Sequence, residues 1–190
     1  MYNNFTMHLP QNETGKLTET RIKQKLESLG LIVRKPVPDV GIDLEVFNPT
    51  NQSKCAKIQV KGRNPKLIKS YRWFQLRVPK IELERARKAV LPADSTWQKK
   101  VGLVDFFILD AVHFDELWVL SKRQIFELIT LNEQQYGSRP DNVFVYAENM
   151  KSKQKEMNLE TKVTGIPIIE RFESCKNNFG PILEFLDIKP

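Results

Sequence analysis

The sequence contains few of the residues that support redox or zinc chemistry. Its 190 residues include 2 cysteines and 2 histidines, too few for a disulfide framework, a zinc cluster or a multi-histidine metal site. It has no GxxxxGK[ST] phosphate loop and no GxGxxG dinucleotide fingerprint. These absences disfavour zinc and serine-triad hydrolases. We therefore expect any active site to be built from carboxylates and lysine.

Long apolar segments are also missing. The longest apolar run, residues 101–112, is interrupted by Asp105 and Asp110 and falls short of the ~20 residues of a membrane span. The amino terminus has neither the basic start nor the apolar segment of a secretory signal. We therefore expect a cytoplasmic protein with no membrane partner. With 41% hydrophobic and 28% charged residues, the composition is typical of a single domain over residues 1–190.

Positive charge is concentrated in one part of the chain. The net charge is +7, but residues 54–100 contain fourteen Lys or Arg against three acidic residues, and the rest of the chain is net negative. A basic block of this kind is typical of proteins that bind a polyanion. The alternative interpretation is a solvated basic surface without a partner.

Hydrophobic periodicity and turn residues predict an α/β domain with a mixed sheet. The capping-box pair Ser121 and Gln124 marks the start of one helix. We expect helices at 14–29, 81–90 and 121–131, and strands at 31–34, 42–47, 56–62, 73–78, 104–109, 116–120 and 143–146.

A carboxylate lies on the apolar stripe of the first predicted helix. Glu19 is spaced three to four residues from the stripe members on either side of it, which are Gly15, Ile22, Leu26 and Leu29. One interpretation places Glu19 at the periphery, with its carboxylate reaching water. The other makes it a ligand directed at a site at the end of the sheet.

Polar residues alternate with apolar residues on two predicted neighbouring strands. Side chains alternate between the faces of a strand, so Asp43 and Glu45 share one face while Ile42, Leu44 and Val46 share the other. On the partner strand, Gln59 and Lys61 alternate with Ile58 and Val60. If the apolar sets pack on one side, the polar sets converge on the other. An amphipathic hairpin with a solvated salt bridge would give the same pattern.

These residue types are those that phosphodiester hydrolysis needs. Mg²⁺ prefers oxygen ligands, which two carboxylates and an amide would supply. The ion polarises the phosphate and activates a water molecule. A nearby lysine can orient that water or stabilise the charge that develops on phosphorus. The basic block begins beside these residues and would bind the phosphates.

The chain resembles the PD-(D/E)XK nuclease superfamily, which includes restriction endonucleases, Holliday junction resolvases and repair nucleases. The resemblance covers about residues 14–120 and rests on Glu19, Pro38-Asp39 with Gly41-Ile42-Asp43, and Gln59-Val60-Lys61-Gly62. It implies a restriction-endonuclease-like αβββαβ core, a mixed β-sheet flanked by helices. We place this core at about 14–132, followed by an extension at about 133–190 for dimerisation or DNA recognition.

The resemblance also implies roles for individual residues. Asp43, Gln59, Lys61 and Glu19 form the catalytic set, and Asp43, Gln59 and Glu19 hold Mg²⁺, for which Mn²⁺ can substitute. Gln59 occupies a position that is usually acidic in the family. Asp39 is a supporting group or the alternative acid, and Glu45 is a candidate to replace the charge absent at Gln59.

The function implied is a Mg²⁺-dependent endodeoxyribonuclease. Within that class, a chain longer than a bare core favours a Type II restriction endonuclease that acts on double-stranded DNA as a homodimer. The alternatives are a Holliday junction resolvase or another structure-specific nuclease, a nuclease acting on RNA, and a nucleic-acid-binding module without catalysis. The predicted DNA contacts are Arg63, Lys66, Lys69, Arg72, Arg77, Lys99 and Lys100.

We predict that DNA affinity falls steeply with salt concentration. Each neutralised phosphate contributes about −0.9 to the slope of log affinity against log salt. Changing Arg63, Lys66 and Lys69 together to alanine should therefore flatten this slope by about two to three units, as measured by fluorescence anisotropy between 50 and 200 mM salt. A wild-type slope near zero would show that the basic block is only a solvated surface.

Overall fold

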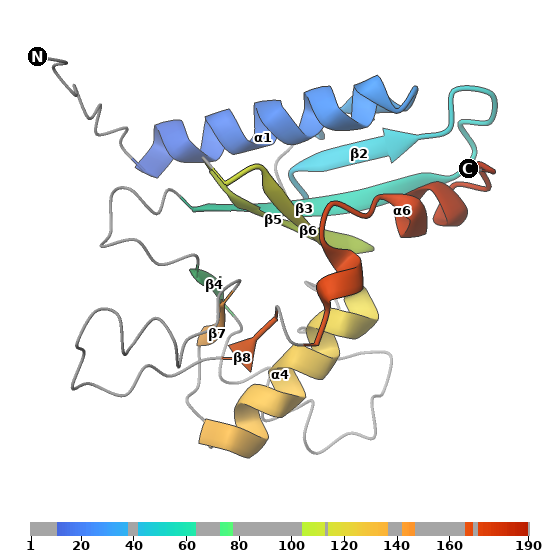
Figure 1. The fold of residues 1–190 in the computed structure, drawn as a ribbon. Coiled ribbons are helices and arrows are strands. Elements are labelled where there is room, and N and C mark those ends of the chain that lie inside the picture. Colours follow the sequence, from blue (N-terminus) through green and yellow to red (C-terminus); the bar gives the residue numbers. More distant parts are fainter. Residues whose placement is uncertain are drawn as a thin grey trace, which may run out of the picture.

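The computed structural model describes residues 11–37, 42–63, 73–77, 104–112, 114–136, 142–146, 166–168 and 171–189. Figure 1 shows the arrangement of their helices and strands. In chain order these are α1 (Gln11–Ser28), β1 (Ile32–Arg34), β2 (Leu44–Phe47), β3 (Cys55–Arg63), β4 (Trp73–Arg77), β5 (Phe106–Ala111), β6 (Glu116–Ser121), α4 (Lys122–Tyr136), β7 (Asn142–Tyr146), β8 (Ile166–Pro167), the 3-10 helix η2 (Glu173–Cys175) and α6 (Gly180–Phe185).

The main sheet is mixed and has β3 at its centre. Its strand order is β1-β2-β3-β5-β6. The pairs β1/β2, β2/β3 and β5/β6 are antiparallel, whereas β3 and β5 are parallel. A parallel pair requires a crossover connection, which the chain makes between residues 63 and 106. The predicted α/β class with a mixed, helix-flanked sheet is therefore confirmed.

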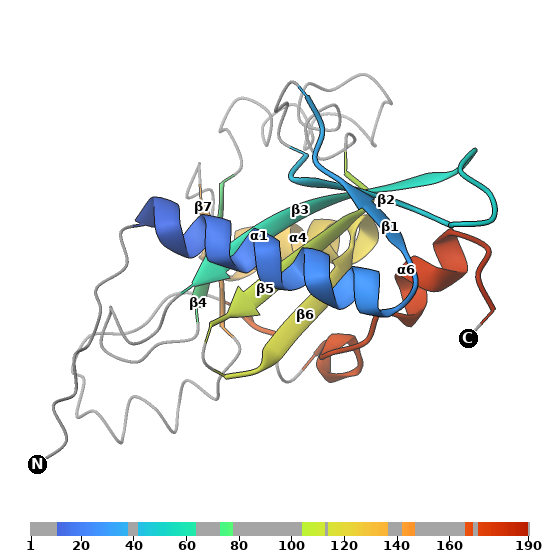
Figure 2. The ribbon, with the colours of Figure 1, turned by 90° about the horizontal axis from the view of Figure 1, so that it is seen from above.

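Helix α1 covers one face of the main sheet. Ile22 and Leu26, one turn apart on its inner side, are fully buried, and Gly30 ends the helical segment with a φ of 81° that favours glycine. Figure 2 shows α1 running across the strands, with α6 near one edge. The core on this face also includes Leu44, Val46, Ala56, Ile58, Val60, Phe106, Ile108, Phe179, Ile182 and Leu186.

Helix α4 and a second sheet cover the other face. The second sheet has the order β4-β7-β8, and the core between the layers includes Phe74, Phe107, Leu109, Trp118, Ile125, Leu128 and Ile168. The predicted capping box at the start of α4 is confirmed, because Gln124 Oε1 accepts the Ser121 N–H at 2.8 Å and the Gln124 N–H donates to Ser121 Oγ at 3.4 Å. Within the described ranges, no helix has the length and hydrophobicity to cross a membrane.

Two features of the fold differ from the sequence-based expectations. The strand predicted at 73–78 exists as β4, but it pairs with β7 in the second sheet and not with the main sheet. The core does not end near residue 132, because Phe179, Ile182 and Leu186 pack against the α1 face of the main sheet. These apolar side chains cover part of the core near the edge of the sheet where α6 lies. The predicted helix at 81–90 lies outside the described residues.

Candidate active site

The central strand β3 carries the predicted Gln59-Val60-Lys61-Gly62 segment. Ile58 and Val60 are buried in the core beneath α1, whereas Gln59 and Lys61 are half-buried and therefore project from the opposite face of the strand. The alternation predicted for this strand is confirmed. Because β5 pairs with β3 over residues 58–63, Gln59 and Lys61 project from a backbone that is held in the sheet.

Asp43 lies against this segment. Its backbone N–H donates to the carbonyl of Ile58 at 2.9 Å, and its carboxylate Oδ2 accepts the backbone N–H of Val60 at 2.6 Å. Val60 is the residue between Gln59 and Lys61. The structure therefore brings Asp43 directly to the part of β3 where the sequence predicted the remaining catalytic residues.

Strand alternation, however, does not explain the position of Asp43. The prediction that Ile42 shares a face with Leu44 and Val46 is wrong, because Ile42 packs in the core on the α4 side and the other two pack beneath α1. Leu44 is the register partner of Ile58, yet the N–H of Asp43 also bonds to Ile58. Two residues thus oppose one, as in a β-bulge, and such an extra residue reverses the alternation.

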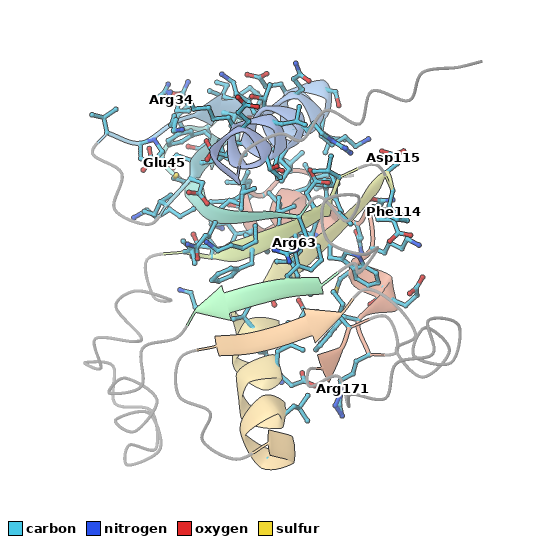
Figure 3. All side chains as sticks on the ribbon, turned by 90° about the vertical axis from the view of Figure 1, so that its left-hand side faces the viewer. Arg34, Glu45, Arg63, Phe114, Asp115 and Arg171 are labelled. Atoms are coloured by element: carbon cyan, nitrogen blue, oxygen red, sulfur yellow. The ribbon has the colours of Figure 1, made fainter. Side chains whose placement is uncertain are left out.

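Glu45 lies farther from the segment than Asp43 does. Its partners in the sheet are Lys57 on β3 and Arg34 on β1, so it stands two residues before Gln59 along β3. Figure 3 shows Glu45 close to Arg34 and apart from Arg63, which follows Gly62. A positive charge therefore already stands opposite Glu45. Asp39, the alternative acid, lies outside the described residues.

Glu19 comes from α1 and is held by an ion pair. Its carboxylate Oε2 accepts a hydrogen bond from Lys35 Nζ at 2.7 Å, and its side chain is 27% exposed. Lys35 directly follows β1, whose last residue pairs with Glu45, so this ion pair lies beside the start of β2. The preceding helix residue, Thr18, packs against Gly62 of β3. Glu19 is therefore at the same end of the sheet as Asp43 and Lys61.

The donor set has the chemistry of a site for a hard cation. Asp43 and Gln59 offer carboxylate and amide oxygens from neighbouring strands, which are the ligand types that Mg²⁺ prefers. Glu19 would complete the set if the cation displaced Lys35, and an exposed ion pair of this kind contributes only ~0–1 kcal/mol. In the part of the chain that the structure describes, no three His, Cys, Asp or Glu residues form a group able to hold a metal ion. The amide of Gln59 is therefore essential to this assignment.

Most of the predicted DNA contacts lie outside the described residues. This is so for Lys66, Lys69, Arg72, Lys99 and Lys100, and also for the side chain of Arg77, whose backbone belongs to β4. Arg63 is the last residue of β3 and is half-buried, and this burial lowers the pKa of its guanidinium. Its carbonyl accepts the N–H of Val112 at 2.9 Å. A role for Arg63 in DNA binding stays a prediction.

Sequence reasoning assigned no role to Asp110, although its position in an apolar run is unusual. Asp110 is paired with Gly62 in the parallel register of β3 and β5, and its side chain is fully buried, with neither carboxylate oxygen hydrogen-bonded. Burial raises its pKa to about 6, against the opposing effects of Arg21 and the Thr18 hydroxyl. Arg21 Nε lies 3.7 Å from Asp110 Oδ2.

Asp105, the other acid in the same run, has a structural role. Its Oδ2 accepts the N–H of Lys57 at 2.9 Å, and its backbone carbonyl accepts the N–H of Lys122 at 2.9 Å. It thereby joins the beginnings of β5 and α4 to β3. The two acids that interrupt one apolar run thus differ, since Asp105 is satisfied by backbone groups and Asp110 is not.

Known proteins resemble this chain in structure and not in sequence. No protein-family model and no curated protein sequence matches the chain. Among solved structures, the chain is similar to the bacterial homing endonuclease I-Ssp6803I, with 12% sequence identity, a TM-score of 0.48, and coverage of 92% of this chain and 93% of that chain. The function proposed below is derived from the geometry of the site.

We predict that Asp110→Asn changes how stability depends on pH. A folded-state pKa of about 6, against an ordinary 3.8, means that the charged form of Asp110 opposes folding. Its contribution to stability is therefore fully present below pH ~4 and is lost as the pH rises through ~6. The free energy of unfolding of the variant relative to wild type should increase by up to about 3 kcal/mol over this range, as measured by urea denaturation.

The matched control for this experiment is Asp115→Asn. Asp115 Oδ1 is also 3.7 Å from Arg21, but its side chain is fully exposed and is the smallest of the influences on the pKa of Asp110, so this variant should change the pH profile far less than Asp110→Asn does. A stability difference between Asp110→Asn and wild type that does not vary with pH would contradict the assignment of a raised pKa to Asp110.

Proposed function

We propose that the chain is a Mg²⁺-dependent deoxyribonuclease that hydrolyses phosphodiester bonds in double-stranded DNA. One observation carries this proposal. The 2.6 Å hydrogen bond from the Val60 N–H to Asp43 Oδ2 joins an acidic side chain to the strand position between Gln59 and Lys61. The acid therefore lies against the segment of the adjacent strand that carries the amide and the lysine.

Each of these residues has a role in the proposed reaction. Asp43, Gln59 and Glu19 would hold Mg²⁺, which when bound polarises the scissile phosphate and lowers the pKa of a water molecule. Lys61 supplies a positive charge to the negative charge that develops on the phosphate. The pairing of Lys61 with β5 restricts its backbone, so its side chain leaves the sheet from a defined position.

The charge distribution supports a nucleic acid as substrate. The basic segment begins at Lys54, immediately before β3, and continues beyond the end of this strand. Part of that charge is already balanced, because Lys54 Nζ is 3.2 Å from Asp187 Oδ2 and Lys57 is opposite Glu45. The same segment includes Lys61 and Arg63, at the end of β3 where the proposed site lies.

Within this class, we propose a Type II restriction endonuclease that acts as a homodimer. A two-fold symmetric dimer suits a double-strand cut at a palindromic sequence. Digestion of defined DNA with mapped ends tests this assignment. Cuts at one fixed sequence on both strands would support it, whereas cleavage confined to four-way junctions would indicate a resolvase instead.

We predict that Asp43→Asn and Lys61→Ala each lower Mg²⁺-dependent plasmid cleavage by at least about 10²-fold while DNA binding in Ca²⁺ is retained. Asparagine keeps an oxygen that can accept the Val60 N–H, so Asp43→Asn isolates the loss of charge. Asp43→Ala would in addition leave that N–H unpaired, which costs ~1–3 kcal/mol of stability.

Lys57→Ala is the matched control for the lysine. Lys57 is on the same strand as Lys61, and its side chain projects from the same face. It is, however, four residues from Lys61 and is paired with Glu45 of β2. We expect this control to cleave at the wild-type rate. Cleavage at the wild-type rate by Asp43→Asn or Lys61→Ala would remove the active-site assignment.

We predict that Glu19→Gln raises the Mg²⁺ concentration required for half-maximal cleavage by roughly tenfold or more, a common effect of changes around metal ligands. The control is Lys35→Met, which removes the same ion pair but leaves the carboxylate available, and should not raise this requirement. Equal changes in the two variants would show that the ion pair, and not a role toward the metal, explains Glu19.

A further inference from the structure

Helix α1 approaches β3 closely at a glycine. A Cβ atom placed on Gly62 would lie 2.2 Å from Thr18 Oγ1, 2.8 Å from Thr18 Cβ and 3.1 Å from Thr18 Cγ2. Thr18 is fully buried, whereas Gly62 itself is exposed. The backbone φ of Gly62 is not positive; among the described glycines, only Gly30 has a positive φ. Space, and not backbone conformation, therefore requires glycine at this position.

This contact is adjacent in sequence to two residues of the proposed site. Thr18 directly precedes Glu19 on α1, and Gly62 directly follows Lys61 on β3. The neighbouring strand contributes a second attachment, because Asp110 is opposite Gly62 and lies near Arg21 of the same helix. The helical turn that carries Glu19 is thus held against the two parallel strands at the centre of the sheet.

We propose that Gly62 is a positioning residue for Glu19, because the absence of a side chain allows Thr18 to rest directly on β3. The inference depends on the proposed nuclease function. Ordinary contacts of a Cβ atom begin near 3.4 Å, so any side chain at position 62 would displace this part of α1 or its side chain by roughly 1 Å. A misplacement of that size near reacting groups can lower a rate about 10²-fold.

The buried Thr18 hydroxyl also bears on this inference. Thr18 Oγ1 has no hydrogen-bond partner, so Thr18 itself rests on β3 by steric contact, beside the ion pair of Arg21 with Asp110. The close approach depends on steric fit, with Ile22 and Leu26 packed farther along the same side of α1. A steric fit can be altered in graded steps, and its effect on Glu19 can then be measured.

The test is a series of variants in which the contact at position 62 is relieved in stages. Gly62→Ala retains all three close contacts. Combining it with Thr18→Ala leaves only the contact between the two Cβ atoms, at 2.8 Å, and combining it with Thr18→Gly removes every contact to that side chain. The measurements are plasmid cleavage against Mg²⁺ concentration and Mg²⁺ binding to the free protein by calorimetry, with circular dichroism to verify folding.

We expect cleavage by Gly62→Ala to fall about 10²-fold and its Mg²⁺ requirement to rise. The cleavage rate and the Mg²⁺ requirement should both move back toward their wild-type values, partly in the combination with Thr18→Ala and further in the combination with Thr18→Gly. Gly15→Ala is the matched control, because it adds a methyl group to the same helix where nothing lies within 4 Å. This control should have the wild-type Mg²⁺ requirement.

The outcomes separate the two proposals. Wild-type protein that neither binds Mg²⁺ nor cleaves DNA would overturn the proposed function. Active wild-type protein, with a Mg²⁺ requirement that is unchanged in Gly62→Ala or unrelated to the order of the series, would overturn the role of Gly62 alone. If Gly62→Ala does not fold, the combination with Thr18→Ala decides, because the remaining Cβ contact must still raise the requirement above that of the Thr18→Gly combination.

Discussion

Pairing of β3 on both of its edges is the constraint on which the rest of the structure depends. β2 pairs with the first half of β3 and β5 with the second half, so β3 cannot rotate about its axis, and each side chain is assigned to one face. Val60 and Ile58 are directed to the core beneath α1. Gln59 and Lys61 are thereby held on the opposite face without any interaction of their own to orient them.

The position of Asp43 combines a structural and a proposed chemical role. At the irregular start of β2, its side chain accepts the Val60 N–H where a regular ladder would use a backbone carbonyl. The bulge that results sends Ile42 into the core on the α4 side. An acid that ends a strand ladder in this way is fixed in place by the backbone of the neighbouring strand, and such fixed placement is a requirement of an active-site group.

Three buried polar side chains beneath α1 near the proposed site lack hydrogen bonds. Thr14 and Thr18 are buried with hydroxyls that have no hydrogen-bond partner, and the buried Asp110 carboxylate has an ion pair with Arg21 but no hydrogen bond. Buried polar groups without partners are uncommon in folded proteins. Their concentration under the amino-terminal half of α1, beside Gly62, indicates that this contact is not optimised for stability alone.

The sequence by itself determined the features that depend on local pattern. The burial of Ile22 and Leu26 on α1, the alternation along β3 and the capping box at Ser121 all follow from the spacing of residues close together in the chain, because such spacing sets which side chains share a face. The rest of the predicted α1 stripe is wrong, because Leu29 is exposed and Thr14 and Thr18 are buried instead. The proximity of Asp43 to Gln59 and Lys61 was also predictable, since two amphipathic strands joined by a turn can bury their apolar sides only by pairing.

Only the tertiary structure decided the features that depend on contacts between distant segments. The bulge at Asp43 adds one residue to the strand register, and no periodicity in the sequence reveals such an addition. The placement of β4 in a second sheet with β7 depends on which strands find free edges after the main sheet forms. The burial of Asp110 and the fit of Thr18 on Gly62 depend on the distance between α1 and the sheet. That distance is set by the combined shape of side chains from α1, β3 and β5, and not by any one of these elements alone.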